Sequence, residues 1–303
     1  MVIDGVVPPL CTPLTADGDL DRRSLARLCE FLLAAGVDGL FIGGSTGEVA
    51  LLSDEHREAA LAVAVEVAAG AVPVLYGVID TSTVRSIARA RRGQDLGATA
   101  IVATAPFYVS PHPDEMSAHF RLIRSRVDVP LVAYDIPSAV HVKLRPSTVV
   151  ELAKDGVIAA IKDSSGDFAG FRAVVDGTKD LPFQCLTGSE LFADMAIASG
   201  GHGLVPGLGN IDPHGYIRLY RAARAGDLTT AAAEQRRLAR LFAITEVADR
   251  GRIGFTAAAL GSFKAALKLR GIIDTDRTSP PLAPLTDDER TKIRTVLAAA
   301  DLR

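Results

Sequence analysis

Short apolar runs alternate with longer segments of helical periodicity along most of the chain. From Tyr76, the predicted strand ends step to Thr104, Tyr134, Lys162 and Thr187, at intervals of about 25 to 30 residues, which is one strand plus one helix. Such alternation is typical of parallel sheets built from βα units. This spacing is the feature that most limits the folds available to the sequence.

Eight strands are predicted in all. They cover residues 6–12, 40–42, 72–76, 100–103, 131–134, 158–162, 183–186 and 203–206. Eight such units within about 200–250 residues are typical of a (β/α)8 barrel, and a doubly wound sheet of six strands fits less well. Beyond Asp212 the chain has helical character, including 222–248 and 257–269. We therefore expect a barrel over residues 1–225 and a small C-terminal helical extension over residues 226–303.

The first predicted helix shows the expected amphipathic pattern. Its apolar residues recur at helical spacing: Leu25, Leu28, Cys29, Leu32 and Leu33. Ser24 is the expected N-cap, and Gly36 is expected to end the helix. One face is therefore apolar, as a helix that covers a sheet requires.

Composition excludes several classes of function. Of the 303 residues, 48% are apolar and 23% are charged, which is a globular composition, and the net charge of −3 makes a nucleic-acid or anionic-membrane partner unexpected. Cys11, Cys29 and Cys185 form no C-x-x-C motif, so we expect no disulfide framework and a reducing, cytoplasmic location. Neither a signal peptide nor a membrane span is expected, because no basic segment precedes an apolar stretch and no apolar run reaches spanning length.

Polar residues follow most of the predicted strands. The segments are 43–48 after the second strand, 106–108 after the fourth, 134–137 after the fifth, 162–167 after the sixth, 188–190 after the seventh and 205–210 after the eighth. In (β/α)8 barrels the active site lies at the C-terminal ends of the strands. We therefore expect these segments to converge on one active site.

Lys162 and Tyr134 are the strongest catalytic candidates. Lys162 ends an apolar run, and burial at the barrel mouth would favour the neutral amine that attacks a carbonyl. Tyr134 precedes it by one βα unit, so its phenol is expected on the neighbouring strand end, where it can carry a proton while an imine forms. Taken alone, the lysine is more typical of a strand end that reaches water, and the tyrosine of a core aromatic.

Other motifs narrow the chemistry. The segment 43–48 offers glycines, backbone N–H groups and two hydroxyls suited to an anion, but it lacks the order of a nucleotide P-loop, so a carboxylate is the expected ligand. The six histidines lack the spacing of a zinc site, and we expect no metal. No G-x-S-x-G motif is present, which argues against a serine hydrolase.

Three of these segments together resemble the dihydrodipicolinate synthase and N-acetylneuraminate lyase family, the pyruvate-dependent class I aldolases. They are the Gly-Ser-Thr-Gly-Glu loop ending at Glu48, the Tyr-x-x-Pro motif beginning at Tyr134, and the Lys-Asp-Ser-Ser-Gly-Asp run beginning at Lys162. They occur in the family's order and at its spacing, and the similarity extends over essentially the whole chain. The resemblance is specific for the superfamily and much less so for the substrate.

The resemblance implies a role for each of several residues. Lys162 would form a Schiff base with a 2-oxo acid, usually pyruvate, with no cofactor or metal. Tyr134 would donate and accept protons, and Thr46 would hold the substrate carboxylate. Ser45 and Tyr108 would form a hydroxyl relay to Tyr134.

Two further positions and an assembly follow from the same resemblance. The backbone of Val205 would contact the bound oxo acid, and Gly188 would line the same pocket. In the family the equivalent of Tyr108 often reaches in from a neighbouring subunit, so we expect a homotetramer built as a dimer of dimers.

The sequence also departs from the family. Ala139 stands where the synthase has an arginine that binds the carboxylate of its second substrate. This difference weakens the prediction of synthase activity unless Arg250 or Arg252 reaches the pocket. His141 is a candidate for contacting a polyhydroxylated chain, although a surface histidine after a turn is the more ordinary reading. Asp135 replaces a common asparagine and places a carboxylate near Tyr134, unless it caps a turn.

Four functions remain open. The leading one is a cofactor-free class I aldolase or lyase that acts on a 2-oxo acid. A substrate derived from a sugar, as for N-acetylneuraminate lyase or 2-keto-3-deoxygluconate aldolase, is one form of this function. The second is 4-hydroxy-tetrahydrodipicolinate synthase, which condenses pyruvate with aspartate semialdehyde. A dehydratase or hydratase-aldolase using the same imine is the third, and a non-catalytic binder of oxo acids is the fourth.

Overall fold

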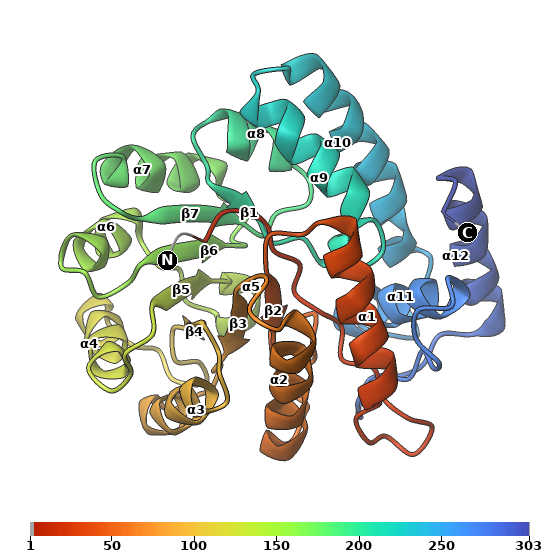
Figure 1. Ribbon diagram of the computed structural model, residues 1–303, viewed down its shortest axis with the longest axis horizontal. Helices are drawn as coiled ribbons and strands as arrows, with labels where there is room; N and C mark the ends of the chain where they lie inside the picture. Colours follow the sequence, from red (N-terminus) through yellow and green to blue (C-terminus); the bar gives the residue numbers. More distant parts are fainter. Residues whose placement is uncertain (1–2, 303) are drawn as a thin grey trace.

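Residues 3–302 are described by the computed structural model, and they form a barrel of eight parallel strands surrounded by helices (Figure 1). The strands are β1 (Gly5–Val6), β2 (Leu40–Ile42), β3 (Val74–Gly77), β4 (Ala100–Thr104), β5 (Leu131–Asp135), β6 (Ala160–Asp163), β7 (Gln184–Thr187) and β8 (Gly203–Leu204). From β2 to β8 each strand pairs with the next in sequence, and β1 pairs with β8. A parallel bridge between Pro9 and Phe41 joins the remaining edges of β1 and β2. The predicted (β/α)8 barrel is therefore confirmed.

Helices connect the strands and continue beyond them. They are α1 (Arg22–Ala35), α2 (Asp54–Ala68), α3 (Thr83–Asp95), α4 (Pro113–Arg124), α5 (Pro137–Val140), α6 (Pro146–Lys154), α7 (Phe168–Thr178), α8 (Ala193–Ala198), α9 (Pro213–Arg224), α10 (Leu228–Phe242), α11 (Phe255–Leu269) and α12 (Asp287–Ala299). Two 3₁₀ turns, η1 (Gly207–Asn210) and η2 (Ala243–Glu246), complete the set. Among residues 3–302 no strand follows Leu204, and no helix is both long and apolar enough to cross a membrane.

Three local predictions were wrong. The first strand ends at Val6 instead of continuing to residue 12, because Pro8 and Pro9 cannot donate a ladder hydrogen bond. The N-cap of α1 is Asp21, whose carboxylate accepts from the Ser24 backbone N–H at 3.0 Å, so Ser24 lies inside the first turn. The helix predicted over 222–248 is broken where α9 ends.

That break has a clear cause. Gly226 adopts a left-handed conformation (φ +77°), which ends α9, and Asp227 caps the start of α10 by accepting from the Thr230 backbone N–H. The predicted stop of α1 at Gly36 is confirmed, since this residue is also left-handed (φ +88°) and its N–H bonds back to the helix.

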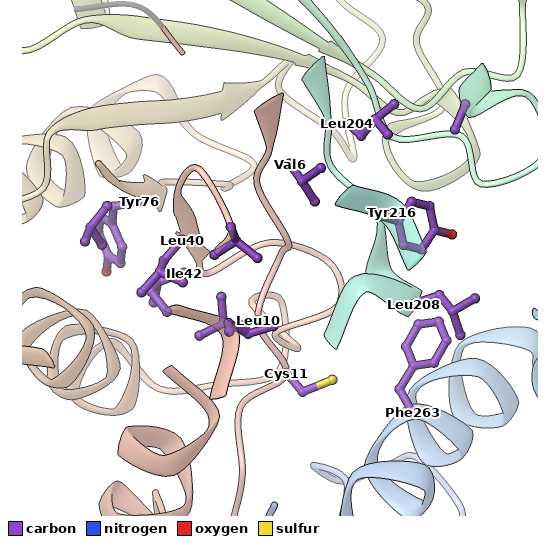
Figure 2. Close-up of a cluster of buried hydrophobic side chains, with 14 of the residues drawn as sticks. Val6, Leu10, Cys11, Leu40, Ile42, Tyr76, Leu204, Leu208, Tyr216 and Phe263 are labelled. Atoms are coloured by element: carbon purple, nitrogen blue, oxygen red, sulfur yellow. The ribbon is translucent and has the colours of Figure 1, made fainter. Parts of the chain in front are cut away.

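Side chains alternate between the two faces of the strands, and this alternation separates two cores. Residues such as Val132 and Ala160 fill the interior of the barrel, whereas Ala133 and Ile161 pack outward against the helices. Figure 2 shows part of the outer core, where Leu40 and Ile42 share one face of β2. Tyr134 lies two residues after Val132, and Lys162 two residues after Ala160, so both side chains face the interior. Lys162 therefore stands inside the barrel mouth.

The C-terminal helices pack against the barrel on the side of α1 and α9 (Figure 1). Phe263 of α11 lies close to Leu208 of η1 in the outer core (Figure 2). The next residue of α11, Lys264, forms a fully buried ion pair with Glu48, in the loop after β2. The other oxygen of Glu48 accepts from the Ser279 backbone N–H at 2.5 Å. The C-terminal part of the chain thereby holds a loop that carries predicted site residues.

We expect Lys264→Met to lower the free energy of unfolding by about 3–5 kcal/mol, because it leaves the Glu48 carboxylate buried without its cation. Adding Glu48→Gln in the same chain should recover part of that loss, since no unpaired charge then remains. Urea denaturation of the three proteins measures both changes. Lys268→Met on the same helix is the control, because the Lys268 pair with Asp276 is half exposed and about 1 kcal/mol or less is expected. Equal losses for Lys264→Met and Lys268→Met would contradict the assignment.

Candidate active site

Lys162 and Tyr134 are direct partners across β5 and β6, with their Cα atoms in register. Only 5% of Lys162 and 2% of Tyr134 is exposed. The Lys162 Nζ lies 4.0 Å from the centroid of the Tyr134 ring and 5.0 Å from that of Phe41. The amine therefore sits inside the barrel mouth between two aromatic rings, and not in bulk solvent.

The Tyr134 hydroxyl lies 3.4 Å from the Ser45 Oγ. Burial alone would raise the pKa of Tyr134, but the nearby charge of Lys162 and hydrogen bonds from Ser45 and Ser164 together lower this pKa below its usual value. A more acidic phenol beside an amine can exchange protons with it more readily. The pair thus has the geometry for proton transfer at the amine.

Lys162 opens into a cavity of about 590 Å³ at the C-terminal end of the barrel. Six of the seven predicted site residues line it: Ser45, Thr46, Tyr134, Lys162, Gly188 and Val205. The cavity is large enough for a small oxo acid and a second reactant.

Two glycines keep this cavity open. A Cβ on Gly188 would lie 3.0 Å from the Lys162 Cε and 2.0 Å from the Ser164 Oγ. A Cβ on Gly207 would lie 3.2 Å from the Thr46 Oγ1. The Lys162 stem can therefore lie close to the backbone of residue 188, and the Thr46 hydroxyl close to that of residue 207, only because both residues are glycines without a Cβ.

Tyr108 is the predicted residue that does not join the others. It follows β4 in a left-handed conformation (φ +75°), and 96% of it is exposed. It does not line the cavity, so the hydroxyl relay expected from the resemblance is incomplete within one chain. A second cavity of about 210 Å³, lined by Ser45, Thr104 and Phe107 among others, adjoins the first on this side.

Glu190 is a site residue that sequence reasoning placed in the loop after β7 without giving it a role. Its Oε1 accepts from the Leu208 backbone N–H at 2.7 Å, while its buried Oε2 has no hydrogen-bond partner. Burial raises the pKa of Glu190 to about 7, against the opposing effect of backbone hydrogen bonds and of Lys162. Its position two residues after Gly188 was the only available signal, because burial of a carboxyl group is not visible in a single sequence.

The remaining candidates lie outside the cavity. Asp135 points away from the site, where it pairs with Lys143 and accepts from the Leu144 backbone N–H at 3.1 Å, so its role is structural. His141 is exposed at the end of α5. Arg252 binds Glu289 and the Pro284 carbonyl.

Arg250 is the last of these candidates. Its guanidinium lies 5.3 Å from the ring centroid of Phe255, a residue that lines the cavity. Arg250 itself is not among the residues that line the cavity.

We expect Gly188→Ala to reduce covalent capture of a ketone by Lys162 at least about tenfold, because the new methyl group would lie 2.0 Å from the Ser164 Oγ and 3.0 Å from the Lys162 Cε and must displace both side chains. A rise of about 1.4 kcal/mol in the barrier is enough for that factor. Borohydride trapping followed by intact mass spectrometry measures the capture. Gly254→Ala is the control, because a Cβ there meets no atom within 4 Å. Unchanged trapping by folded Gly188→Ala would show that the close approach is unimportant.

A second prediction concerns stability and pH. Because the folded-state pKa of Glu190 is raised from 4.5 to about 7, folding is favoured while the group is protonated, and this advantage is lost as the pH rises from about 4.5 to 7. Glu190→Gln removes this dependence, so the variant should gain roughly 3 kcal/mol relative to the wild type across that window. Urea denaturation at several pH values measures the difference. Parallel stability curves for the two proteins would exclude a titrating buried carboxyl group.

The chain is similar to known proteins both in sequence and in structure. A model of the dihydrodipicolinate synthetase family matches residues 2–300. The 4-hydroxy-tetrahydrodipicolinate synthase of Haloarcula marismortui is 33% identical over 298 residues, covering 98% of this chain and 94% of the relative.

Two solved structures agree with this result. A prophage protein of the dihydrodipicolinic acid synthase family from E. coli K12, in complex with pyruvate, has a TM-score of 0.92 and 29% identity over all of both chains. The chloride-inhibited dihydrodipicolinate synthase of Acinetobacter baumannii, complexed with pyruvate, has a TM-score of 0.91 and 28% identity, also over all of both chains. The chain belongs to the dihydrodipicolinate synthase family and is a carbon–carbon lyase of the class I aldolase type.

Proposed function

We propose that Lys162 forms a covalent imine with a 2-oxo acid, pyruvate in the first instance, and that this imine makes or breaks a carbon–carbon bond. The observation that carries the proposal is the buried Lys162 amine, 4.0 Å from the Tyr134 ring centroid, at the base of an open cavity. Two structural neighbours were solved with pyruvate, which supports this choice of oxo acid.

Each of the other site residues has a place in this reaction. The Thr46 hydroxyl and the N–H groups of the glycine-rich backbone around it donate hydrogen bonds to the carboxylate of the oxo acid. Tyr134 takes and returns the protons that must move when the Lys162 amine attacks the ketone and water leaves. The protonated imine then withdraws electrons from the adjacent bond, which is the electron sink that the lyase chemistry needs.

Incubation with pyruvate and borohydride should leave one reduced pyruvate on Lys162, located by peptide mass spectrometry. Lys162→Ala should lack the adduct. Tyr134→Phe should still fold and should lower the turnover number by about 10²–10⁴, because proton transfer is lost while the amine remains. An unmodified wild-type lysine under these conditions would refute the proposal.

A second candidate is 4-hydroxy-tetrahydrodipicolinate synthase, the name carried by the relative from Haloarcula marismortui. Ala139 supplies no cation where the synthase has its arginine. A coupled assay with pyruvate and aspartate semialdehyde decides between the candidates. A turnover number on the order of 1–10³ s⁻¹ would establish the synthase activity.

We also infer a homotetramer in a cytoplasmic setting. The exposed Tyr108 side chain and the cavity of about 210 Å³ that reaches Ser45 support a contact in which Tyr108 of a second copy completes the hydroxyl relay. The buried, unpaired cysteines Cys11, Cys29 and Cys185 support a reducing compartment.

The relay has a direct test. Tyr108→Phe should lower the turnover number while pyruvate trapping persists. Light scattering of the wild type should give the mass of four chains, and an active monomer would exclude this assembly.

A further inference from the structure

The cavity beyond Lys162 has a lining of mixed character. The hydroxyls of Ser45 and Thr46 suit the carboxylate of an oxo acid. The rest of the lining includes the hydroxyls of Ser138, Ser189 and Thr256 but consists mainly of large apolar side chains: Ile136, Leu191, Phe242, Phe255, Leu260 and Phe263. Any second reactant that meets the imine must be desolvated against these walls.

Within residues 3–302, Lys162 is the only lysine or arginine among the residues that line this cavity. Arg252 is paired with Glu289, and the Arg250 guanidinium, 5.3 Å from the Phe255 ring centroid, is not among the residues that line the cavity. Ala139, at the mouth, has no group that can bind an anion. A carboxylate on the second reactant would therefore lose its hydration without gaining an ion pair.

Glu190 adds to this selectivity. It lines the cavity and keeps one buried oxygen without a partner. When ionised, this carboxylate repels a second one in the same low-dielectric space, and when protonated it can donate a hydrogen bond to a neutral oxygen. Only the ionised state therefore selects against an anionic reactant, because a protonated carboxyl group donates to a carboxylate as well as to a neutral oxygen.

We propose that the partner of the pyruvate imine is an uncharged aldehyde with an apolar aryl or alkyl body, held between the phenylalanine-rich wall and Ile136. This inference rests on the proposed imine at Lys162. Loss of a proton from the pyruvate methyl group gives the enamine, which forms a carbon–carbon bond to the aldehyde carbon while the aldehyde oxygen takes up a proton. Water then hydrolyses the imine, releasing a 4-hydroxy-2-oxo acid and the free lysine.

The test compares aldehydes that differ only in charge, each with pyruvate: benzaldehyde against its para-carboxylate, and butanal against succinic semialdehyde. Glyceraldehyde represents polyhydroxylated partners. We expect kcat/KM for the uncharged member of each pair to be higher by tenfold or more, and higher than for glyceraldehyde. Preference for a carboxylate or for glyceraldehyde, or no turnover of any aldehyde, overturns the inference.

Borohydride trapping with pyruvate alone, on the same preparation, separates the two proposals. An adduct on Lys162 together with a preference for carboxylates overturns only the choice of aldehyde. No adduct overturns the proposed imine and the inference that rests on it.

A variant tests the cause of the selectivity. Ala139 is exposed at the cavity mouth, so Ala139→Arg can be accommodated and supplies a cation. It should raise kcat/KM for succinic semialdehyde relative to butanal about tenfold, whereas Ala34→Arg on the exposed face of α1 should leave that ratio unchanged. An unchanged ratio in Ala139→Arg, with pyruvate trapping retained, would show that charge at this wall does not select the aldehyde.

Discussion

The pairing of β5 with β6 is the constraint on which the site depends. It places Tyr134 and Lys162 side by side, and the two-residue repeat of a strand turns both into the barrel. A shift of either strand by one residue would turn one of these side chains outward to the helices. The parallel ladder therefore fixes the spacing of amine and phenol more rigidly than loops alone could.

Much of this arrangement was predictable from the sequence. The spacing of the strand ends gave the barrel, and each strand from the second to the seventh lies within two residues of its predicted position. The apolar run before Lys162 indicated the end of a buried strand, whereas the facing of its side chain into the barrel comes from the register of β5 and β6. The first strand and the cap of α1 were less predictable, because prolines and a competing aspartate changed the local hydrogen bonding.

What escaped prediction depends on contacts between distant parts of the chain. The hydrogen bond from Ser279 to Glu48 joins residues 231 positions apart, and no local pattern announces it. Glu190 reads as an ordinary loop carboxylate until the packing of η1 buries it beside Leu208. Glu48 and Glu190 are both acidic, but their roles differ. Glu48 is neutralised by Lys264, whereas Glu190 keeps one oxygen without a hydrogen-bond partner.

The anchoring of Glu48 has a consequence for the newly synthesised protein. Lys264 and Ser279 follow all eight strands in the chain, so until they are synthesised the loop bearing Ser45 and Thr46 lacks both of the contacts made to Glu48. A nascent chain can therefore complete the strands of its barrel before this loop has the contacts that hold it in the folded protein.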